Sequence, residues 1–382
     1  MLTDPQILEL RAQFPILRDK TYLYNCSQGA LSLSVEAGLA AYTQSWRTSI
    51  DPWREWSAVW EELRAVFAHF IHASPDEVAL VTSASAGINP IANALPFPSH
   101  RNRVVMGEYE FPTMGHIWLA QQPRGAQVEF LQGVDQTLPL DAYDHAIDER
   151  TAIVPVTQVS FVNGFRADIA AITRIAHQRG ALVFLDGYQD CGTRPLDVKA
   201  LDVDFFVTGT LKYLLGPAGL AFLYVRRELI ESLTPTITSW MAQRNAFAFD
   251  PQTLDPAPSA RRFDAGTPPV PNIYMVRAAL SLLNNIGFDN VAAQVERLTR
   301  AFLTGVDALR ISCKTPADSI GPLVVLRAHD APTLVSRLAD RNIAVSARRD
   351  GVRFAFHVYN TIEDVDTALE ALAANLDLLV RA

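Results

Sequence analysis

The sequence predicts an α/β fold: a large domain built on a mainly parallel sheet, followed by a smaller α+β domain. One observation is a strand–helix–strand pattern, in which a β-branched run at 151–157 and a buried run at 181–186 enclose an amphipathic helix. A second is another apolar, strand-like run at 205–209. A third is a proline-rich stretch at 251–271, beyond which amphipathic helices alternate with short strands.

The domain boundaries follow from chain length and from this proline-rich stretch. A chain of 382 residues is too long for one simple core and indicates at least two domains. We therefore predict an N-terminal segment at 1–20, a large domain at 21–260 and a small C-terminal domain at 261–382.

The first part of the chain is predicted to be mostly helical. A short helix within 1–20 precedes a brief strand at 22–25, and a helical pattern then runs from Ser34 to about Ala73. This pattern contains four tryptophans, which are typical of a core or a subunit interface: Trp46, Trp53, Trp56 and Trp60.

Two turns that follow predicted strands are candidates for ligand binding. The strand at 78–82 breaks into small residues that include Ala84 and Ser85 and that open a helix. Backbone amides at such a helix start can bind an anion, although serine is also an ordinary capping residue. After the strand at 103–107, Phe111 stands just before the next helix, where its ring could stack on a planar ligand or belong to the core.

Asp186 and Lys212 carry the main chemical signal. Asp186 ends a buried strand, at the edge where open α/β sheets bind ligands. Lys212 follows the run at 205–209 and precedes a tight loop at 216–219. A partly buried lysine can form a Schiff base with a carbonyl, although a lysine at a strand end can also simply extend to water. A carboxylate, a Schiff-base lysine and a phosphate-binding turn together are what pyridoxal 5′-phosphate (PLP) requires.

The small domain is predicted to combine helices and short strands. One amphipathic helix covers 291–309, and strands are expected near 323–327, 343–346 and 352–358. Thr361 with Asp364 resembles a capping box and begins the last helix.

Composition limits the classes of partner. A net charge of −8 and a pI near 5.5 argue against nucleic acid or an acidic membrane as a partner. The three cysteines are widely spaced and indicate neither a disulfide framework nor a metal site. The N-terminus does not resemble a signal peptide, and no apolar run has membrane-spanning length, so we expect a cytoplasmic protein.

The order of the motifs resembles the class V aminotransferases. They are Glu-x-x-Phe-Pro-Thr from Glu108, Asp-Gly-x-Gln from Asp186, Thr-Gly-Thr-Leu-Lys from Thr208, Ala-Gly-Thr from Ala265 and Arg-x-x-x-x-x-Tyr-Asn-Thr from Arg353. That family contains fold-type I PLP enzymes, among them cysteine desulfurases, kynureninases, selenocysteine lyases and isopenicillin N epimerases. The resemblance runs from about Tyr22 to the C-terminus and implies an aspartate aminotransferase-like fold with a seven-stranded sheet.

The resemblance implies a role for several residues. Lys212 would hold PLP as an internal aldimine, Asp186 would pair with the pyridine nitrogen, and Gln189 would hydrogen-bond the ring hydroxyl. Phe111 would stack on the ring. Arg353 would bind the α-carboxylate of a small amino-acid substrate through two parallel hydrogen bonds.

Further contacts would hold the cofactor phosphate. The resemblance assigns Ala84 and Ser85 to it, with help from Thr210. Thr267 would reach the phosphate of the neighbouring subunit, since active sites in this family form at the interface of a homodimer.

The sequence departs from the family pattern at several positions. Phe161 stands where many members have an asparagine, and Leu211 stands where many have a phosphate-binding side chain. The stretch 345–351 has no cysteine, whereas desulfurases carry a sulfur-accepting cysteine there. With Phe111 also unable to transfer protons, we predict that the chain is not a cysteine desulfurase.

The remaining expectation is a PLP enzyme that acts on a small amino acid through an external aldimine and an α-carbanion. An aminotransferase or a β-eliminating lyase would use that chemistry, with Lys212 as the base for the α-proton. An amino-acid epimerase or a kynureninase-like hydrolase is the alternative. A catalytically silent relative is a further one, against which the presence of Lys212, Asp186, Gln189 and Arg353 argues.

Overall fold

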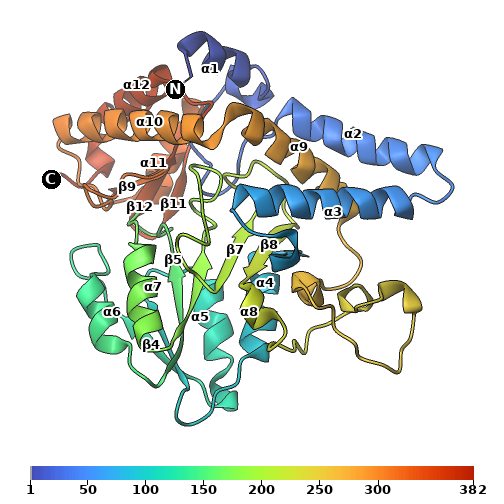
Figure 1. Ribbon diagram of the computed structural model, residues 1–382. Helices are drawn as coiled ribbons and strands as arrows, with labels where there is room; N and C mark the ends of the chain where they lie inside the picture. Colours follow the sequence, from blue (N-terminus) through green and yellow to red (C-terminus); the bar gives the residue numbers. More distant parts are fainter. Residues whose placement is uncertain (1) are drawn as a thin grey trace.

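A seven-stranded sheet forms the centre of the large domain in the computed structural model, which describes residues 2–382 (Figure 1). The strand order is β2-β8-β7-β6-β5-β3-β4, and only β8 runs antiparallel to its neighbours. The strands are β2 (Val78–Val81), β3 (Arg103–Gly107), β4 (Gln127–Leu131), β5 (Thr151–Thr157), β6 (Leu182–Asp186), β7 (Phe205–Gly209) and β8 (Ala221–Val225). The predicted α/β fold with a mainly parallel seven-stranded sheet is confirmed.

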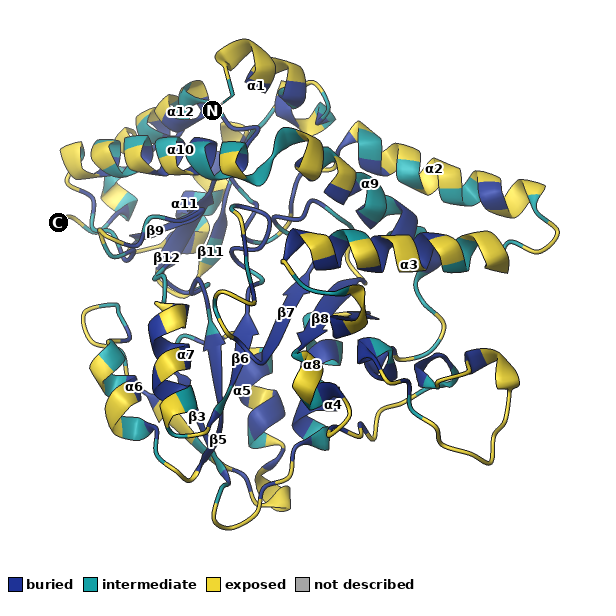
Figure 2. Ribbon diagram, in the orientation of Figure 1, coloured by how far each residue is buried: buried dark blue, intermediate teal, exposed yellow. Residues whose placement is uncertain are grey.

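Helices cover both faces of this sheet. Side chains of α3 (Trp53–Phe70), α6 (Leu140–Ala146) and α7 (Ile169–Gln178) share one core with the sheet. Those of α4 (Ala84–Ala94), α5 (Pro112–Leu119) and α8 (Arg227–Ile230) share the other. Because successive residues of a strand point to opposite faces, a doubly covered sheet needs continuous apolar strands, and the strands are accordingly buried throughout most of their length (Figure 2).

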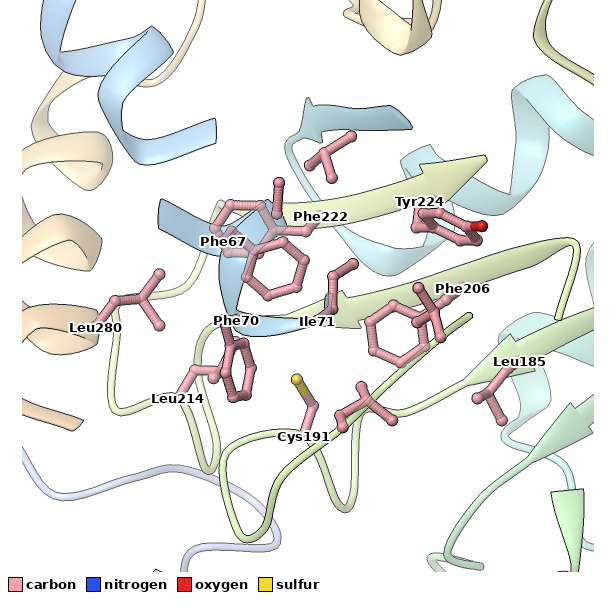
Figure 3. Close-up of a cluster of buried hydrophobic side chains, with 14 of the residues drawn as sticks. Phe67, Phe70, Ile71, Leu185, Cys191, Phe206, Leu214, Phe222, Tyr224 and Leu280 are labelled. Carbon is pink, nitrogen blue, oxygen red and sulfur yellow. The ribbon is translucent and has the colours of Figure 1, made fainter. Parts of the chain in front are cut away.

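Aromatic packing joins α3 to the sheet (Figure 3). The ring of Phe67 stacks on the ring of Phe222, with centroids 3.7 Å apart and planes 4° from parallel. Cys191 lies in the same core, where burial raises the pKa of its thiol. β5, β6 and β7 contribute side chains to this core, which therefore supports their carboxyl ends.

The C-terminal part of the chain contains a three-stranded antiparallel sheet in the order β11-β12-β9. Its strands are β9 (Leu323–Arg327), β11 (Ser346–Arg348) and β12 (Gly351–Ala355), and its helices are α10 (Phe288–Ala308), α11 (Ala331–Asp340) and α12 (Ile362–Ala373). Thr361 and Asp364 form the predicted capping box at the start of α12.

The N-terminal segment is attached to this C-terminal part. β1 (Thr21–Tyr22) pairs with β10 (Ile343–Ala344), and Arg11 of α1 (Asp4–Arg11) forms an ion pair of 2.7 Å with Asp364. The two ends of the chain therefore pack against each other, and the turn after β1 lies next to β12. The amide of Ala355 donates to the carbonyl of Leu23.

Some elements differ from the sequence prediction. The helical pattern from 34 to 73 is two helices, α2 (Leu33–Thr48) and α3, separated around Pro52. α9 (Val270–Ile286) follows the proline-rich stretch yet packs against α2 and α3 (Figure 1). The boundary at 260 stays a prediction.

None of the helices within residues 2–382 combines the length and the apolar character needed to cross a bilayer. Nor do these residues bring together three side chains of the kinds that ligate metals.

Candidate active site

A cavity of about 240 Å³ lies at the carboxyl edge of the large sheet and is lined by residues of both sheets. Its lining is Cys26, Ser27, Phe111, Thr157, Phe161, Asp186, Tyr188, Gln189, Lys212, Arg348 and Arg353. Five residues predicted from the sequence therefore meet in one place, although they are spread over more than 240 positions of the chain: Phe111, Asp186, Gln189, Lys212 and Arg353.

Asp186 presents a buried carboxylate at the end of β6. It accepts a hydrogen bond of 2.9 Å from the amide of Tyr188, and burial raises the pKa of its carboxyl group. Within residues 2–382 it forms no ion pair with a basic side chain. A ligand with a protonated ring nitrogen would supply the missing cationic partner and stabilise the ionised carboxylate.

Gln189 has an unused acceptor. Its Nε2 donates to the carbonyl of Cys26 at 3.0 Å, whereas its Oε1 is buried without a hydrogen-bond partner in the described chain. Buried polar atoms are nearly always paired, so this oxygen indicates a ligand group that donates to it, such as a hydroxyl.

Lys212 follows β7 and reaches back into the cavity. Its Nζ lies 4.1 Å from the centroid of the Tyr188 ring and 5.8 Å from that of Phe111. Burial lowers the pKa of the amine to about 8; the charges of Arg353 and Arg348 act in the same direction, and Asp186 opposes them. A lysine with such a pKa has a substantial neutral fraction near neutral pH and is nucleophilic.

Two phenylalanines form one wall. Phe111 is the N-cap of α5 and its side chain is half-exposed. Its ring meets that of Phe161 edge-on, with centroids 5.1 Å apart and an angle of 72°. Phe161, where the sequence departs from the family pattern, thus packs against the ring of Phe111 and supports it.

Arg353 is almost completely buried, yet it has no anionic partner among the described residues. Its Nη2 donates to Ser27 Oγ at 2.8 Å and its Nε to Ser346 Oγ at 3.0 Å. A third, longer bond goes to the carbonyl of Phe161. A buried cation that meets only neutral acceptors is costly, so the site favours an anionic ligand such as a carboxylate.

Ala84 and Ser85 lie in the first turn of α4. The side chain of Ser83 caps this helix by accepting from the amide of Ala86. Ser85 Oγ lies 3.4 Å from Thr113 Oγ1, so the starts of α4 and α5 stand together next to Phe111. Free amides at two helix starts suit an anion.

Thr210 and Thr267 are placed differently. The buried Thr210 has its Oγ1 2.7 Å from the carbonyl of Pro217 and 3.0 Å from that of Leu220, and it does not line the cavity. Thr267 is exposed in the loop before α9, away from the cavity of its own chain. Their contacts with a phosphate stay predictions.

Five cavity residues were not predicted from the sequence: Cys26, Ser27, Thr157, Tyr188 and Arg348. The Cys26 thiol is buried in the wall with its Sγ 3.4 Å from Ser346 Oγ. The polar turn after β1 was visible in the sequence, but its position depends on the pairing between the two ends of the chain.

The low pKa of Lys212 leads to a testable pH dependence. In protein freed of cofactor, we expect acylation of Lys212 by a small amine-directed reagent to rise with a midpoint near pH 8, because only the neutral amine reacts. The Lys212→Ala variant, which lacks this amine, is the control and should not be labelled at this position. Peptide-resolved mass spectrometry at a series of pH values measures the labelling. A Lys212 profile without a midpoint near pH 8 would contradict the assignment.

The protein-family model described as "Aminotransferase class-V" matches residues 39–368 of this chain. Among curated relatives, the uncharacterized aminotransferase YcbU of Bacillus subtilis is 34% identical over 369 residues, which cover 96% of this chain and 97% of the relative. A probable cysteine desulfurase of Streptomyces coelicolor is 31% identical and covers 95% of both chains.

Solved structures share the fold. The apo structure of a cysteine desulfurase from Thermococcus onnurineus NA1 superposes with a TM-score of 0.90, at 22% identity, and covers 99% of both chains. The Escherichia coli cysteine desulfurase CsdA superposes with a TM-score of 0.87 over the full length of both chains, at 23% identity.

These relatives correct the prediction that the chain is not a cysteine desulfurase. Curated cysteine desulfurases are 29–31% identical to it over most of its length. The exclusion relied on the lack of a cysteine at 345–351 and on Phe111, which cannot transfer protons. It did not place Cys26, which the fold brings to the cavity from the other end of the chain. The prediction that the chain is not a cysteine desulfurase was therefore wrong.

Proposed function

The chain belongs to the class-V aminotransferase family, whose enzymes use PLP, and from this premise we propose that it cleaves the carbon–sulfur bond of a cysteine-type amino acid. The family, the enzyme class and the cofactor predicted from the sequence are confirmed by the family match and the relatives. The reaction and the site residues below are our proposal. The observation that carries it is the buried Arg353, which has no anionic partner within residues 2–382 and shares one cavity with the Lys212 amine.

The unused groups of the cavity fit PLP. When bound, PLP supplies an electron sink that labilises bonds at the α-carbon of an amino acid. Lys212 would hold it covalently, and its amine, once released, would take the α-proton. Asp186 would face the ring nitrogen, Gln189 the ring hydroxyl and Phe111 one face of the ring. Ala84 and Ser85 would present their amides to the phosphate.

Arg353 would orient the substrate. Its guanidinium can exchange the hydroxyls of Ser27 and Ser346 for the two oxygens of a carboxylate without losing hydrogen bonds. The substrate α-carbon is then held near Lys212, which lines the same cavity.

Two observations support carbon–sulfur cleavage over other reactions of the family. Several relatives are named cysteine desulfurases, including ones 31% and 29% identical. Cys26 also places a thiol on the cavity wall. A desulfurase transfers the substrate sulfur to such a thiol, so that cysteine and an enzyme thiol yield alanine and an enzyme persulfide. A lyase instead yields pyruvate, ammonia and hydrogen sulfide from cysteine and water.

The experiment is to incubate the purified holoenzyme with a panel of amino acids and to measure alanine, pyruvate, ammonia and sulfide. We expect alanine from cysteine, with a persulfide on Cys26 detected by mass spectrometry. Cys26→Ser should lose alanine formation and keep the absorption band of the bound cofactor. Cys313→Ser, which changes a thiol in the C-terminal sheet region, is the matched control.

Other product patterns separate the alternatives. Pyruvate and sulfide in equal amounts, unaffected by Cys26→Ser, would show a lyase and refute the role of Cys26. A keto acid from sulfur-free amino acids, with no sulfur product from cysteine, would refute carbon–sulfur cleavage altogether.

We also propose a homodimer in which Thr267 contacts the phosphate of the neighbouring subunit. The exposed position of Thr267 supports this, as do exposed aromatic side chains: Trp46 on α2, and Phe247 and Phe249 on the segment between α8 and α9. Together they offer apolar surface of the kind found at subunit interfaces. Sedimentation velocity should show a dimer at assay concentrations, and an active monomer would contradict it.

A cytoplasmic location completes the proposal. All three cysteines are unpaired, as is usual for proteins of reducing compartments: Cys26, Cys191 and Cys313. Fractionation of source cells would test it.

A further inference from the structure

Cys26, the proposed acceptor of the substrate sulfur, lies on the inner wall of the cavity. Its side chain is 1% exposed and packs in a small buried cluster with Tyr213, Leu323, Val325 and Ala355. Of the residues that line the cavity, Phe111 and Arg348 are exposed and mark its open side. A persulfide on Cys26 would therefore face the cavity and not the surface of the protein.

The turn that carries Cys26 is bound on several sides. The Cys26 carbonyl accepts a hydrogen bond of 3.0 Å from Gln189 Nε2. The neighbouring Asn25 is fully buried; its amide donates to the carbonyl of Ala355 at 3.1 Å, and its oxygen accepts from the Tyr359 hydroxyl. Because buried polar groups that lose their partners are costly, these bonds hold Cys26 in the cavity and oppose an outward movement of its turn.

The space in front of Cys26 is small. The cavity has a volume of about 240 Å³, below the roughly 300–1,000 Å³ of pockets for drug-sized ligands, and the proposed cofactor takes part of it. A cysteine side chain is short, so the thiol of another protein could meet Cys26 only if the backbone of that protein entered the cavity. These dimensions favour a small molecule as the acceptor that removes the sulfur from Cys26.

Arg353 indicates the charge of this acceptor. Ser346 Oγ lies 3.4 Å from Cys26 Sγ and accepts from Arg353 Nε at 3.0 Å, so one hydroxyl separates the thiol from the guanidinium. When the alanine product leaves, Arg353 is again a buried cation with no anionic partner among residues 2–382. A carboxylate on the acceptor can bind there and hold the acceptor thiol close to Cys26.

From these contacts, and resting on the proposed function, we propose that the persulfide sulfur of Cys26 passes to a small thiol that carries a carboxylate. The acceptor thiolate attacks the outer sulfur of the persulfide and forms a new sulfur–sulfur bond. The bond between the outer sulfur and Cys26 Sγ breaks, and Cys26 leaves as a thiolate. The step needs no oxidant or reductant, and the reaction that follows this enzyme consumes a small-molecule persulfide.

Discharge of the sulfur-loaded enzyme tests this proposal. Holoenzyme is incubated with one equivalent of cysteine, desalted and mixed with 3-mercaptopropionate, with the uncharged 3-mercaptopropionamide or with a folded protein that has one exposed thiol. Mass spectrometry follows the persulfide on Cys26, and each rate is divided by the rate of the same thiol with a small disulfide in solution. We expect 3-mercaptopropionate to react about tenfold faster than its amide, and the protein thiol to act no faster than buffer alone.

Alkylation tests the role of Arg353 without turnover. Iodoacetate and iodoacetamide are similar in size and differ in charge, and their rates at Cys26 are compared with their rates at free cysteine. In the wild-type holoenzyme we expect Cys26 to favour iodoacetate about tenfold in this comparison, and Arg353→Gln should reduce the preference to within twofold. Arg349→Gln, which removes an exposed charge of the same hairpin outside the cavity lining, is the matched control and should keep the preference.

The outcomes separate this inference from the proposed function. If cysteine leaves no persulfide on Cys26, the proposed function is wrong and this inference falls with it. If the persulfide forms and the protein thiol removes it as fast as 3-mercaptopropionate does, the proposed function stands and a small acceptor is refuted. Equal discharge rates for the acid and its amide, or an alkylation preference that Arg353→Gln leaves unchanged, would overturn the carboxylate.

Discussion

Replacing Lys212 with alanine is expected to abolish covalent attachment of PLP and to lower turnover by at least roughly 10²–10⁴-fold. The lower bound is the usual contribution of one general acid–base group, and the loss of covalent attachment adds to it. The fold should survive, because the Lys212 side chain forms no ion pair within residues 2–382. Removing Lys212 therefore breaks no ion pair with a buried acid.

The measurement is borohydride reduction followed by peptide mapping. The chain has four lysines, and the other three have other surroundings: Lys199 pairs with Glu77, Lys314 pairs with Asp350, and Lys20 donates to Asn342 Oδ1. Wild-type protein should carry the reduced cofactor on the Lys212 peptide alone, and Lys20→Ala is the control that should behave like the wild type. A reduced label on Lys212→Ala protein would move the cofactor to another lysine.

Much of the large domain could be predicted because its central strands are buried on both faces. β5, β6 and β7 appear in the sequence as short apolar runs, and each ends close to its predicted limit. β4 was missed because this edge strand is largely exposed, with Glu129 in its middle. Exposed edge strands do not have the continuous apolar pattern of central ones.

The site could be predicted in part. The residues that were found are positioned by neighbouring stretches of sequence, and those that were missed are positioned by distant ones. Asp186 and Lys212 were found because a strand end and a nearby loop fix each of them locally. Cys26 and Arg348 were missed because contacts between distant parts of the chain bring them to the cavity: β1 pairs with β10, and Arg353 of the β11–β12 hairpin donates to Ser27 and to the carbonyl of Phe161. These long-range contacts have no local signal.

Thr210 was predicted as a site residue, but the structure does not place it in the cavity lining. The motif around Lys212 gave it a phosphate contact, whereas the structure places its hydroxyl against two backbone carbonyls of the following loop. A hydroxyl has one proton to donate, and nearby carbonyls compete for it. Such competition depends on the path of the loop, which a motif does not describe.

Arg353→Lys should leave the fold and the bound cofactor unchanged and should impair the handling of amino acids. Arg353 binds hydroxyls through two different nitrogens at once, which a lysine ammonium cannot reproduce with the same geometry. If the substrate carboxylate replaces these hydroxyls in the buried site, the loss is roughly 2–5 kcal/mol. This corresponds to about 1.5 to 4 orders of magnitude in kcat/KM.

Amino-acid amides provide the internal check on this prediction. Wild-type enzyme should discriminate strongly between an amino acid and its amide, whereas Arg353→Lys should discriminate little, because the two-pronged partner of the carboxylate is already absent. Arg327→Lys is the matched control, since Arg327 lies on β9 of the same sheet and pairs with Asp350. Spectral titrations of Arg353→Lys that match the wild type for every amino acid tested would show that no carboxylate binds there. The buried guanidinium would then be held for structure by Ser27 and Ser346 alone.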